Sequence, residues 1–370
     1  MGLLRLYSKI TFTKYNDSLG EVAYSEGQGD KYIFKNYVNG METDESYENL
    51  TDIFKIIFPK KGQLKGRNLF ASPDPIFERG DRVKVEMGYF PNLITVFEGW
   101  VSTISAKIPV EITCEDDMWL LKNTNVTFPS KALQTFRYTS KKKGKLLKHP
   151  KYLGPAVTLK ELLSSILPDD IDFTCPDVNL GLFRVSNASV SKVLEELKSK
   201  YGLFSYFRGG KLYCGLPSNA ADTQTHEFVF DKVCPWSVID DSSLEYQLAK
   251  DTSIKVVAKL MGANNTWEEV TVGDSDGAQR SFFLYWDPSS GKPKPNLKDF
   301  AELKLNEVKY DGFRGSFETF GYKYVRHGDI VKLTSTKLPE RNGSYLVVSV
   351  KRSFDTNGYR QTIELGNRVS

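Results

Sequence analysis

Two stretches of this sequence share one pattern, and this pattern decides the fold. The first reads Phe77-Glu78-Arg79-Gly80-Asp81-Arg82-Val83-Lys84-Val85, and the second reads His327-Gly328-Asp329-Ile330-Val331-Lys332-Leu333. Glycine can take the positive φ that a tight turn needs, and the Asp carboxylate can accept hydrogen bonds from nearby backbone amides. We therefore predict that Gly80, Asp81, Gly328 and Asp329 form two structural turns, each of which opens a β-strand.

More β-patterned runs follow each turn, at residues 99–104 and 110–114 in the first copy and 345–350 and 361–365 in the second. In the opening strands, Val83, Val85 and Ile330 are expected on an apolar face, and Arg82, Lys84 and Lys332 on the opposite face. Three antiparallel strands with one wet face form a meander, which either finds a second layer or closes into a small barrel. The alternative is two unrelated meanders that share a common turn dipeptide.

The composition is that of an ordinary globular protein. The chain has 370 residues, of which 40% are hydrophobic and 26% charged, with a net charge of +4 and a mean hydropathy of −0.38. This predicts two or three domains and no strong attraction to nucleic acid or membranes. The N-terminus lacks the apolar core of a signal peptide, and no segment has the apolar length of a membrane span. The four cysteines lack zinc-type spacing and are expected to be free thiols of a reducing compartment: Cys114, Cys175, Cys214 and Cys234.

The middle of the chain changes to a helical period. Thr158 and Glu161 form a capping box before an apolar run, and Ser189 and Gly202 mark the two ends of a second helix, which a hairpin follows. We expect a mainly β, α+β fold in which two similar small β-barrels flank an inserted helix-hairpin module. The predicted domains are residues 1–125 for the first barrel, 126–235 for the inserted α/β domain, and 236–370 for the second barrel with a preceding helix, which Asn296 caps.

Three polar features of the sequence are expected to lie in loops or turns and not in a functional site. The acidic stretch 40–48 is expected to be an exposed loop. His327 precedes a turn and is expected to be a turn or surface residue rather than a ligand. The basic run 141–148 is expected to be a solvated loop, with a nucleic-acid patch as the alternative.

The sequence holds no recognisable active site. The three histidines, His149, His226 and His327, lie in no metal-binding or catalytic arrangement. Adjacent acidic pairs such as Asp116-Asp117, Asp169-Asp170 and Asp240-Asp241 are more typical of helix caps and solvated turns than of general acid and base pairs. We therefore predict a protein that is not an enzyme, with no catalytic residues, no cofactor and no metal ligands.

Four stretches, taken in order, resemble one known family. They are Phe77-x-x-Gly80-Asp81-x-Val83 continuing to Phe97-x-Gly99, then Ile112-x-Cys114-Glu115-Asp116, then Phe183-x-Val185-x-Asn187-Ala188-Ser189, and finally Gly328-Asp329-x-Val331 with Tyr345-Leu346-Val347. Together they resemble the phage late control protein D family, the baseplate or tail hub proteins of contractile and related long-tailed phages. The likeness spans most of residues 77–370, and related hubs occur in type VI secretion and other contractile injection systems.

This resemblance implies a structural role. In that family, the two similar barrels of one chain pack side by side, and three chains make a ring of six barrels that adapts a hexameric tail tube to a trimeric spike. We accordingly expect a homotrimer whose partners are a tail tube or tape-measure protein and a trimeric spike. Because the sequence stops at Ser370 without spike repeats, the spike is expected to be a separate polypeptide. Neither a membrane span nor specific nucleic acid binding is expected.

The expected location is a phage virion tail or a phage-like injection particle, built in the bacterial cytoplasm. The choice between a virion, a prophage and a type VI or other injection system stays open. The rival function is a cell-wall-binding or wall-degrading tail-associated protein, for which residues 155–216 are the candidate binding module.

Overall fold

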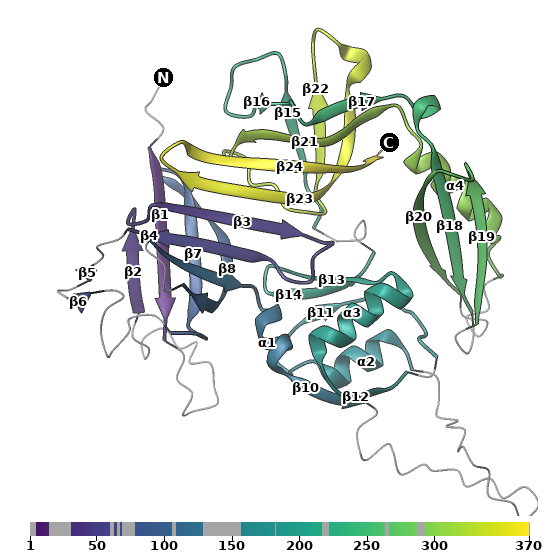
Figure 1. The fold of residues 1–370 in the computed structure, drawn as a ribbon, viewed down its shortest axis with the longest axis horizontal. Helices are drawn as coiled ribbons and strands as arrows, with labels where there is room; N and C mark the ends of the chain where they lie inside the picture. Colours follow the sequence, from purple (N-terminus) through teal and green to yellow (C-terminus); the bar gives the residue numbers. More distant parts are fainter. Residues whose placement is uncertain are drawn as a thin grey trace, which may run out of the picture. The chain divides into compact units, whose positions relative to one another are not determined.

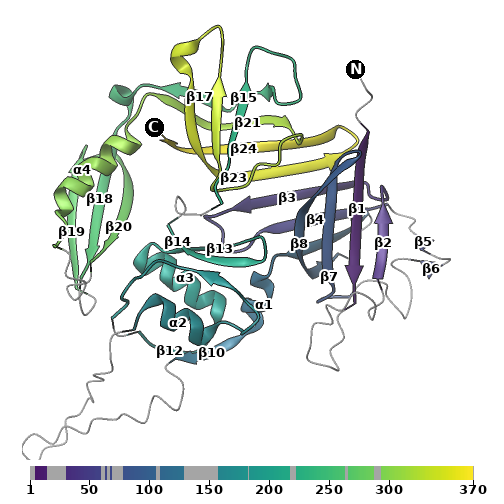
Figure 2. The same cartoon turned by 180° about the vertical axis from the view of Figure 1, so that it is seen from behind.

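A computed structural model of the chain shows a mainly β protein with few helices, arranged in several sheets (Figures 1 and 2). The structure describes residues 5–14, 31–59, 63–64, 67–68, 78–105, 109–128, 157–181, 183–216, 222–262, 266–286 and 293–369. The chain forms two compact units. Unit 1 comprises Met1–Trp119, Pro217–Gln247 and Asp311–Ser370, and unit 2 comprises Leu120–Leu216 and Leu248–Tyr310. The three-domain division stays a prediction, and residues 248–310 are the part in which it differs most from these units.

Within the described residues, unit 1 is built on one sheet of fourteen strands. The first half-sheet consists of β1 (Leu6–Thr13), β2 (Lys31–Lys35), β3 (Gly40–Ser46), β4 (Ile53–Phe58), β7 (Arg82–Tyr89), β8 (Asn92–Ile104) and β9 (Val110–Glu115). The second half-sheet consists of β15 (Thr225–Val229), β16 (Val238–Asp240), β17 (Leu244–Gln247), β21 (Gly312–Phe320), β22 (Ile330–Thr334), β23 (Gly343–Asp355) and β24 (Gly358–Val369). A short pair, β5 (Gln63–Leu64) with β6 (Arg67–Asn68), and a 3₁₀ turn at Pro339–Arg341 complete the unit.

The two half-sheets are joined edge to edge. The strand order is β16-β21-β24-β23-β3-β4-β9-β8-β7-β1-β2, with β17 also beside β21, and with β22 pairing both β23 and β15. Figures 1 and 2 show β24, β23, β3 and β4 side by side, so strands from opposite ends of the chain are neighbours. We call the β3–β23 pairing the seam.

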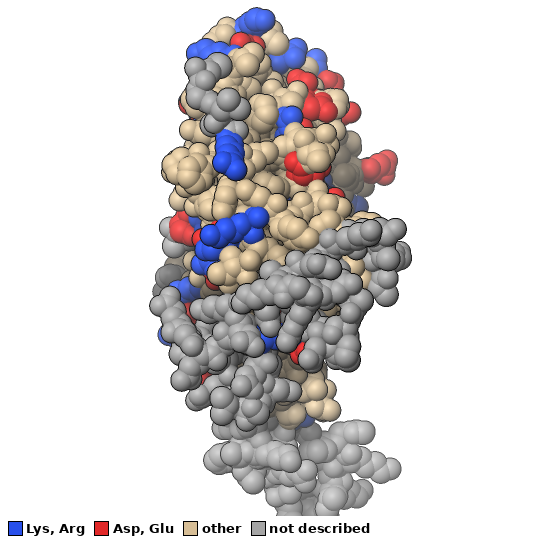
Figure 3. Space-filling model, turned by 90° about the vertical axis from the view of Figure 1, so that its left-hand side faces the viewer, with Lys and Arg blue, Asp and Glu red and all other residues tan. Residues whose placement is uncertain are grey.

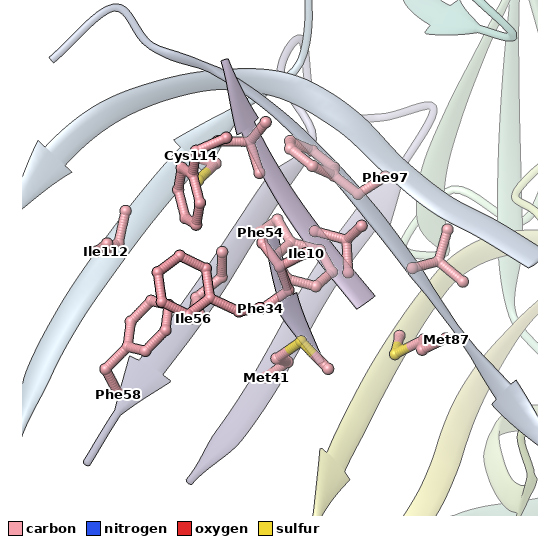
Figure 4. Packing of buried hydrophobic residues seen from close by; sticks show 14 of the residues in the cluster. Ile10, Phe34, Met41, Phe54, Ile56, Phe58, Met87, Phe97, Ile112 and Cys114 are labelled. Atoms are coloured by element: carbon pink, nitrogen blue, oxygen red, sulfur yellow. The ribbon is translucent and has the colours of Figure 1, made fainter. Parts of the chain in front are cut away.

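The first half-sheet curls around its own core. Strands β2 and β4 are far apart in the strand order, yet Phe34 and Phe58 lie with ring centroids 5.3 Å apart. All seven strands contribute buried residues to one cluster, part of which is shown in Figure 4. The second half-sheet has a similar contact, because Phe228 of β15 lies 5.4 Å from Phe317 of β21. Both contacts bring distant strands of a half-sheet together and support the expectation of two barrels.

The strands differ from the predictions in two places. Val83 and Val85 are buried as expected, but Ile330 is only half-buried and shares a face with Lys332, because residues two apart on a strand point the same way. The buried positions of β22 are Val331 and Leu333 instead. The stretch 40–48 was expected to be an exposed loop, and this is wrong. It contains β3, whose polar side chains are largely buried at the seam.

The described part of unit 2 contains three small sheets and most of the helices. The first two sheets pair β10 (Asn125–Phe128) with β12 (Val185–Ser189), and β11 (Phe173–Thr174) with β14 (Lys211–Gly215) and β13 (Phe204–Arg208). The third pairs β18 (Ile254–Met261) with β19 (Trp267–Gly273) and β20 (Ala278–Tyr285). The helices are α1 (Met118–Asn123), which crosses the unit border, α2 (Leu159–Ile166), α3 (Val190–Tyr201) and α4 (Leu297–Val308), with a 3₁₀ turn at Ala249–Asp251.

The predicted caps of α2 and α3 are present. Thr158 and Glu161 form both bonds of the capping box before α2, and Ser189 accepts a bond from the Lys192 amide at the start of α3. Gly202 ends α3 with a φ of 65°, which an L side chain rarely adopts. Each of these signals is local, so nearby residues suffice to predict it. None of the described helices combines the length and apolar composition needed to cross a membrane.

Candidate functional site: twin turns and the seam

The first Gly-Asp turn fastens the start of β7 to the middle of β8. Gly80 has a φ of 92°, and its N–H donates to the Val101 carbonyl at 2.8 Å. The Val101 N–H in turn donates to the Asp81 carbonyl at 2.9 Å. The Asp81 carboxylate accepts the Glu78 N–H at 2.8 Å, which closes the turn. These backbone and side-chain hydrogen bonds connect the turn to Glu78 before it and to Val101 on β8.

The second turn repeats this arrangement bond for bond. Gly328 has a φ of 79° and donates to the Val347 carbonyl at 2.8 Å, while the Val347 N–H donates to the Asp329 carbonyl at 2.8 Å. The Asp329 carboxylate accepts the Arg326 N–H at 3.0 Å, as Asp81 accepts that of Glu78. The two turns are therefore equivalent in backbone conformation, in hydrogen bonding and in their position before the meander.

The strands that follow the turns also correspond in register. Arg82 lies opposite Trp100 in the first copy, and Ile330 lies opposite Leu346 in the second. In each middle strand, the register of pairing with the next strand shifts at the same point. The shift lies between Val101 and Thr103 in β8 and between Val347 and Ser349 in β23. A β-bulge at matching positions is difficult to obtain in unrelated meanders. β7-β8-β9 and β22-β23-β24 are thus two copies of one structural unit.

Each turn carboxylate is buried beside a basic side chain from the neighbouring strand. Lys14, which follows β1, places its Nζ 3.5 Å from Asp81 Oδ2. His226 on β15 places its Nε2 3.2 Å from Asp329 Oδ2. Buried carboxylates are stable only when hydrogen bonds or opposite charges compensate for lost hydration, and both turns meet this need in the same way.

The seam contains a buried ion pair. In the antiparallel β3–β23 register, Arg352 lies opposite Thr43 and Val350 lies opposite Glu45. The Arg352 side chain forms an ion pair with Glu45 and donates to the Val325 carbonyl. Its guanidinium also lies 4.5 Å from the ring centroid of Tyr324. Arg352 is 2% exposed, so the pair is shielded from water.

Other titratable groups are buried near the seam. Burial raises the pKa of Glu45, and the Arg352 guanidinium opposes this rise. Burial raises the pKa of Asp116 well above its usual range, and the nearby Asp52 carboxylate adds to the rise. His327 was expected to be a turn or surface residue; it lies in the turn, but it is buried, with 3% exposure, and lies 3.6 Å from Asp52. The segment between β3 and β4 covers it, which the sequence around His327 does not reveal.

The acidic pair Asp116-Asp117 serves structure. Asp116 Oδ1 accepts the Met118 N–H at 3.1 Å at the start of α1. Asp117 accepts from the Trp100 indole at 2.9 Å and pairs with Arg82. Within the described part of the chain, no group of three or more His, Cys, Asp and Glu side chains is placed to hold a metal. That the protein is not an enzyme stays a prediction.

Charges on the side that lies at the left of Figure 1 are mixed. Figure 3 shows Lys and Arg side chains interspersed with Asp and Glu and separated by wide areas of other residues. The basic run 141–148 and His149 lie outside the described residues, so the structure does not test their interpretation.

Comparisons with known proteins relate this architecture to solved structures. No protein-family model matches the sequence, and no curated protein is detectably similar to it. A tail protein from Neisseria meningitidis MC58 aligns over 98% of this chain and 97% of its own, with 11% identity and a TM-score of 0.53. A 43 kDa tail protein of prophage MuSo2 from Shewanella oneidensis aligns over 98% of both chains, with 13% identity and a TM-score of 0.52. This chain has the fold of phage tail proteins.

The tail-protein fold agrees with the resemblance found in the sequence motifs, which is thereby confirmed for the fold. At 11% and 13% identity, the likeness to these two proteins is one of architecture. Within this fold, the sequence located both turns but missed the residues that surround them. The partners Lys14 and His226, and the pair Glu45 and Arg352, come from strands that are distant in sequence.

Proposed function

We propose that this chain is a structural tail hub protein of a phage or a phage-like injection particle. Three copies form a ring of six similar barrels, which joins a hexameric tail tube to a trimeric spike. The observation that carries the proposal is the duplication within one chain, down to equivalent turns and bulges. A six-fold tube meets a three-fold spike only through a part that presents both symmetries, and three chains with two similar lobes provide this.

The correspondence between the half-sheets extends across four strands. In the first half-sheet, residues that lie opposite one another on adjacent strands form a row from Val101 through Cys114 and Phe54 to Thr43. In the second half-sheet, the corresponding row runs from Val347 through Leu365 and Gly315 to Leu244. The strand β17 therefore occupies in the second half-sheet the place of β3 in the first, and β8 corresponds to β23. By this correspondence Glu45 matches Tyr246, and Val350 matches Ile104.

This correspondence supports a specific contact between chains. Within one chain, the seam pairs β3 of the first half-sheet with β23 of the second. In a ring of near-equivalent lobes, the matching joint pairs β17 of one chain with the end of β8 of the next. Because Glu45 lies opposite Val350 in the seam, Tyr246 is expected opposite Ile104 at the joint, and Gln247 opposite Thr103.

The exposure of Ile104 favours this joint. Val350 is 0% exposed at the seam, whereas its counterpart Ile104 is 39% exposed in the isolated chain. An apolar side chain at a strand edge is a typical site for pairing with another strand. The joint would cover Ile104 as the seam covers Val350, which accounts for an isoleucine at this position.

Light scattering on the purified full chain tests the ring. Three times the chain mass of 41.9 kDa is expected. Ile104→Lys places a charge at the joint and is expected to give a folded monomer. Val233→Lys, at a fully exposed apolar residue outside the joint, is the matched control and should stay trimeric. A stable two-fold dimer, or a trimer that Ile104→Lys leaves intact, would contradict this arrangement.

The spike and the tube or tape-measure protein are tested separately. Co-expression with the products of neighbouring genes, followed by size-exclusion chromatography, is expected to give co-eluting complexes. A trimer that binds none of these products would argue against the hub role while leaving the ring itself in place.

A further inference from the structure

Two cysteines of unit 2, Cys175 and Cys214, directly follow a pair of residues that lie opposite each other on neighbouring strands. Strands β11 and β14 are parallel, with Phe173 opposite Leu212 and Thr174 opposite Tyr213. The next pair in this register is Cys175 and Cys214. The register continues beyond them, because a Cβ built on Gly215 would lie 3.1 Å from Cδ of Pro176. Cys175 and Cys214 are thus bracketed by paired residues on one side and by a close contact on the other.

This placement suits a disulfide bond. Adjacent strands lie about 4.8 Å apart, and paired residues of neighbouring strands project to the same face of the sheet. Disulfides span Cα separations of about 4.4–6.8 Å, so a pair in register is within reach. The two sulfurs are also electrostatically linked. Burial raises the pKa of Cys214 to about 12, and the negative charge of a Cys175 thiolate adds to this rise.

We propose that Cys175 and Cys214 form a redox-controlled disulfide that is open under reducing conditions and closed by a small-molecule disulfide such as oxidised glutathione. Both cysteines are free thiols in this structure, which represents the open form. The inference concerns unit 2 alone and does not depend on the proposed assembly.

The less buried thiol starts the reaction. Cys175 is half-buried and Cys214 is 1% exposed, so the Cys175 thiolate attacks one sulfur of oxidised glutathione and one glutathione thiolate leaves. The Cys214 thiolate then attacks the Cys175 sulfur of the mixed disulfide, and the second glutathione leaves. The two protein thiols give up two electrons and two protons, and glutathione disulfide accepts them as two thiols.

The surroundings make this closure slow at neutral pH. Burial raises the pKa of Cys175, the charge of Lys160 opposes this rise, and the charge of Asp177 adds to it. Because the thiolate is the attacking species, the rate should increase up to about tenfold per pH unit until Cys175 is largely ionised. The bond would link β11 to β14 around a loop that contains β12, α3 and β13, which restricts the unfolded chain.

Peptide mapping of the full chain tests the bond. The protein is incubated with oxidised glutathione at pH 8.5, and its remaining thiols are blocked with iodoacetamide before non-reducing trypsin digestion. A linked peptide of residues 161–184 and 212–232 is expected, with a mass two hydrogens below the sum of both peptides. Cys234→Ser should still form it. Cys175→Ser and Cys214→Ser should not, and Cys214→Ser should accumulate the glutathione adduct on Cys175.

Thermal melting gives an independent readout. The oxidised protein should show a transition about 5 °C or more above that of the reduced protein, and this shift should vanish in the Cys175→Ser variant. A wild-type protein that retains four alkylatable thiols, or that stops at the Cys175–glutathione adduct, would overturn the proposal. Linkage of Cys175 to any cysteine other than Cys214 would do the same.

Discussion

Arg352 on β23 and Glu45 on β3 form an ion pair in the interior of unit 1, although 307 residues separate them in the sequence. The pair lies at the seam where the two half-sheets of one chain join. Its charges are compensated by each other and by the Val325 carbonyl, while the Tyr324 ring lies against the guanidinium. The seam therefore combines strand pairing with a specific buried contact.

Removing the arginine should destabilise unit 1 strongly. Arg352→Met leaves Glu45 buried without its partner, which typically costs about 3–5 kcal/mol in the free energy of unfolding. Lys351→Met is the matched control, because Lys351 is exposed on the same strand and lies 3.7 Å from Asp44; its effect should be about 0–1 kcal/mol. Urea denaturation measures both. Equal effects of the two variants would show that the buried pair has no special role.

The two turn glycines should be equally intolerant of a side chain. Gly80→Ala and Gly328→Ala force an L residue to a φ of 92° or 79°, at a cost of about 1–3 kcal/mol each. In Gly40→Ala, the new Cβ would have its nearest neighbours at 3.7 Å, an ordinary contact, and this variant serves as the control. Near-wild-type unfolding free energies for both turn variants would refute the structural role of these glycines.

The Asp329 carboxylate should be required for the stability of the second turn. It accepts the Arg326 and Gln224 amides, at 3.0 and 3.1 Å. An unsatisfied buried donor costs about 1–3 kcal/mol, so Asp329→Ala should reduce the free energy of unfolding by about 2 kcal/mol or more. Asp329→Asn keeps an acceptor oxygen and should lose less. Chemical denaturation measures both variants, and near-wild-type stability of Asp329→Ala would count against this account.

Replacing Asp116 should stabilise the protein at neutral pH. The folded pKa of Asp116 is raised by burial and by Asp52, so the folded state holds this proton more tightly than the unfolded chain. The contribution of Asp116 to the stability of the folded state is therefore most favourable below the ordinary Asp pKa of about 3.9, and it is lost as the pH rises through the folded pKa. Asp116→Asn removes that loss. The free energy of unfolding of the variant should therefore exceed that of the wild type by about 1 kcal/mol or more at pH 7, and should not exceed it near pH 4.

Urea denaturation between pH 4 and pH 8 measures this dependence. Asp117→Asn is the neighbouring control and should destabilise at pH 7, because it weakens the contacts to Arg82 and to the Trp100 indole. A stability gain of Asp116→Asn that is independent of pH would contradict the assigned cause.

Much of the local architecture could be predicted from the sequence. The Gly-Asp dipeptides, the alternating runs, the capping box at Thr158 and the stop at Gly202 are set by backbone sterics and by bonds between residues a few positions apart. Such signals depend on near neighbours, so they survive in one sequence without further context. The order of motifs also identified the tail-protein fold.

The tertiary structure alone decided which polar residues are inside. The stretch 40–48 has the acidic composition of an exposed loop, yet Glu45 is buried because Arg352 reaches it across the seam. His327 is buried because the segment after β3 covers it, and the parallel register of β11 and β14, continued by one residue, places Cys175 opposite Cys214. For Glu45 and His327, the cost of burying a polar group is offset by a partner that is remote in sequence, and the folded backbone determines which groups meet.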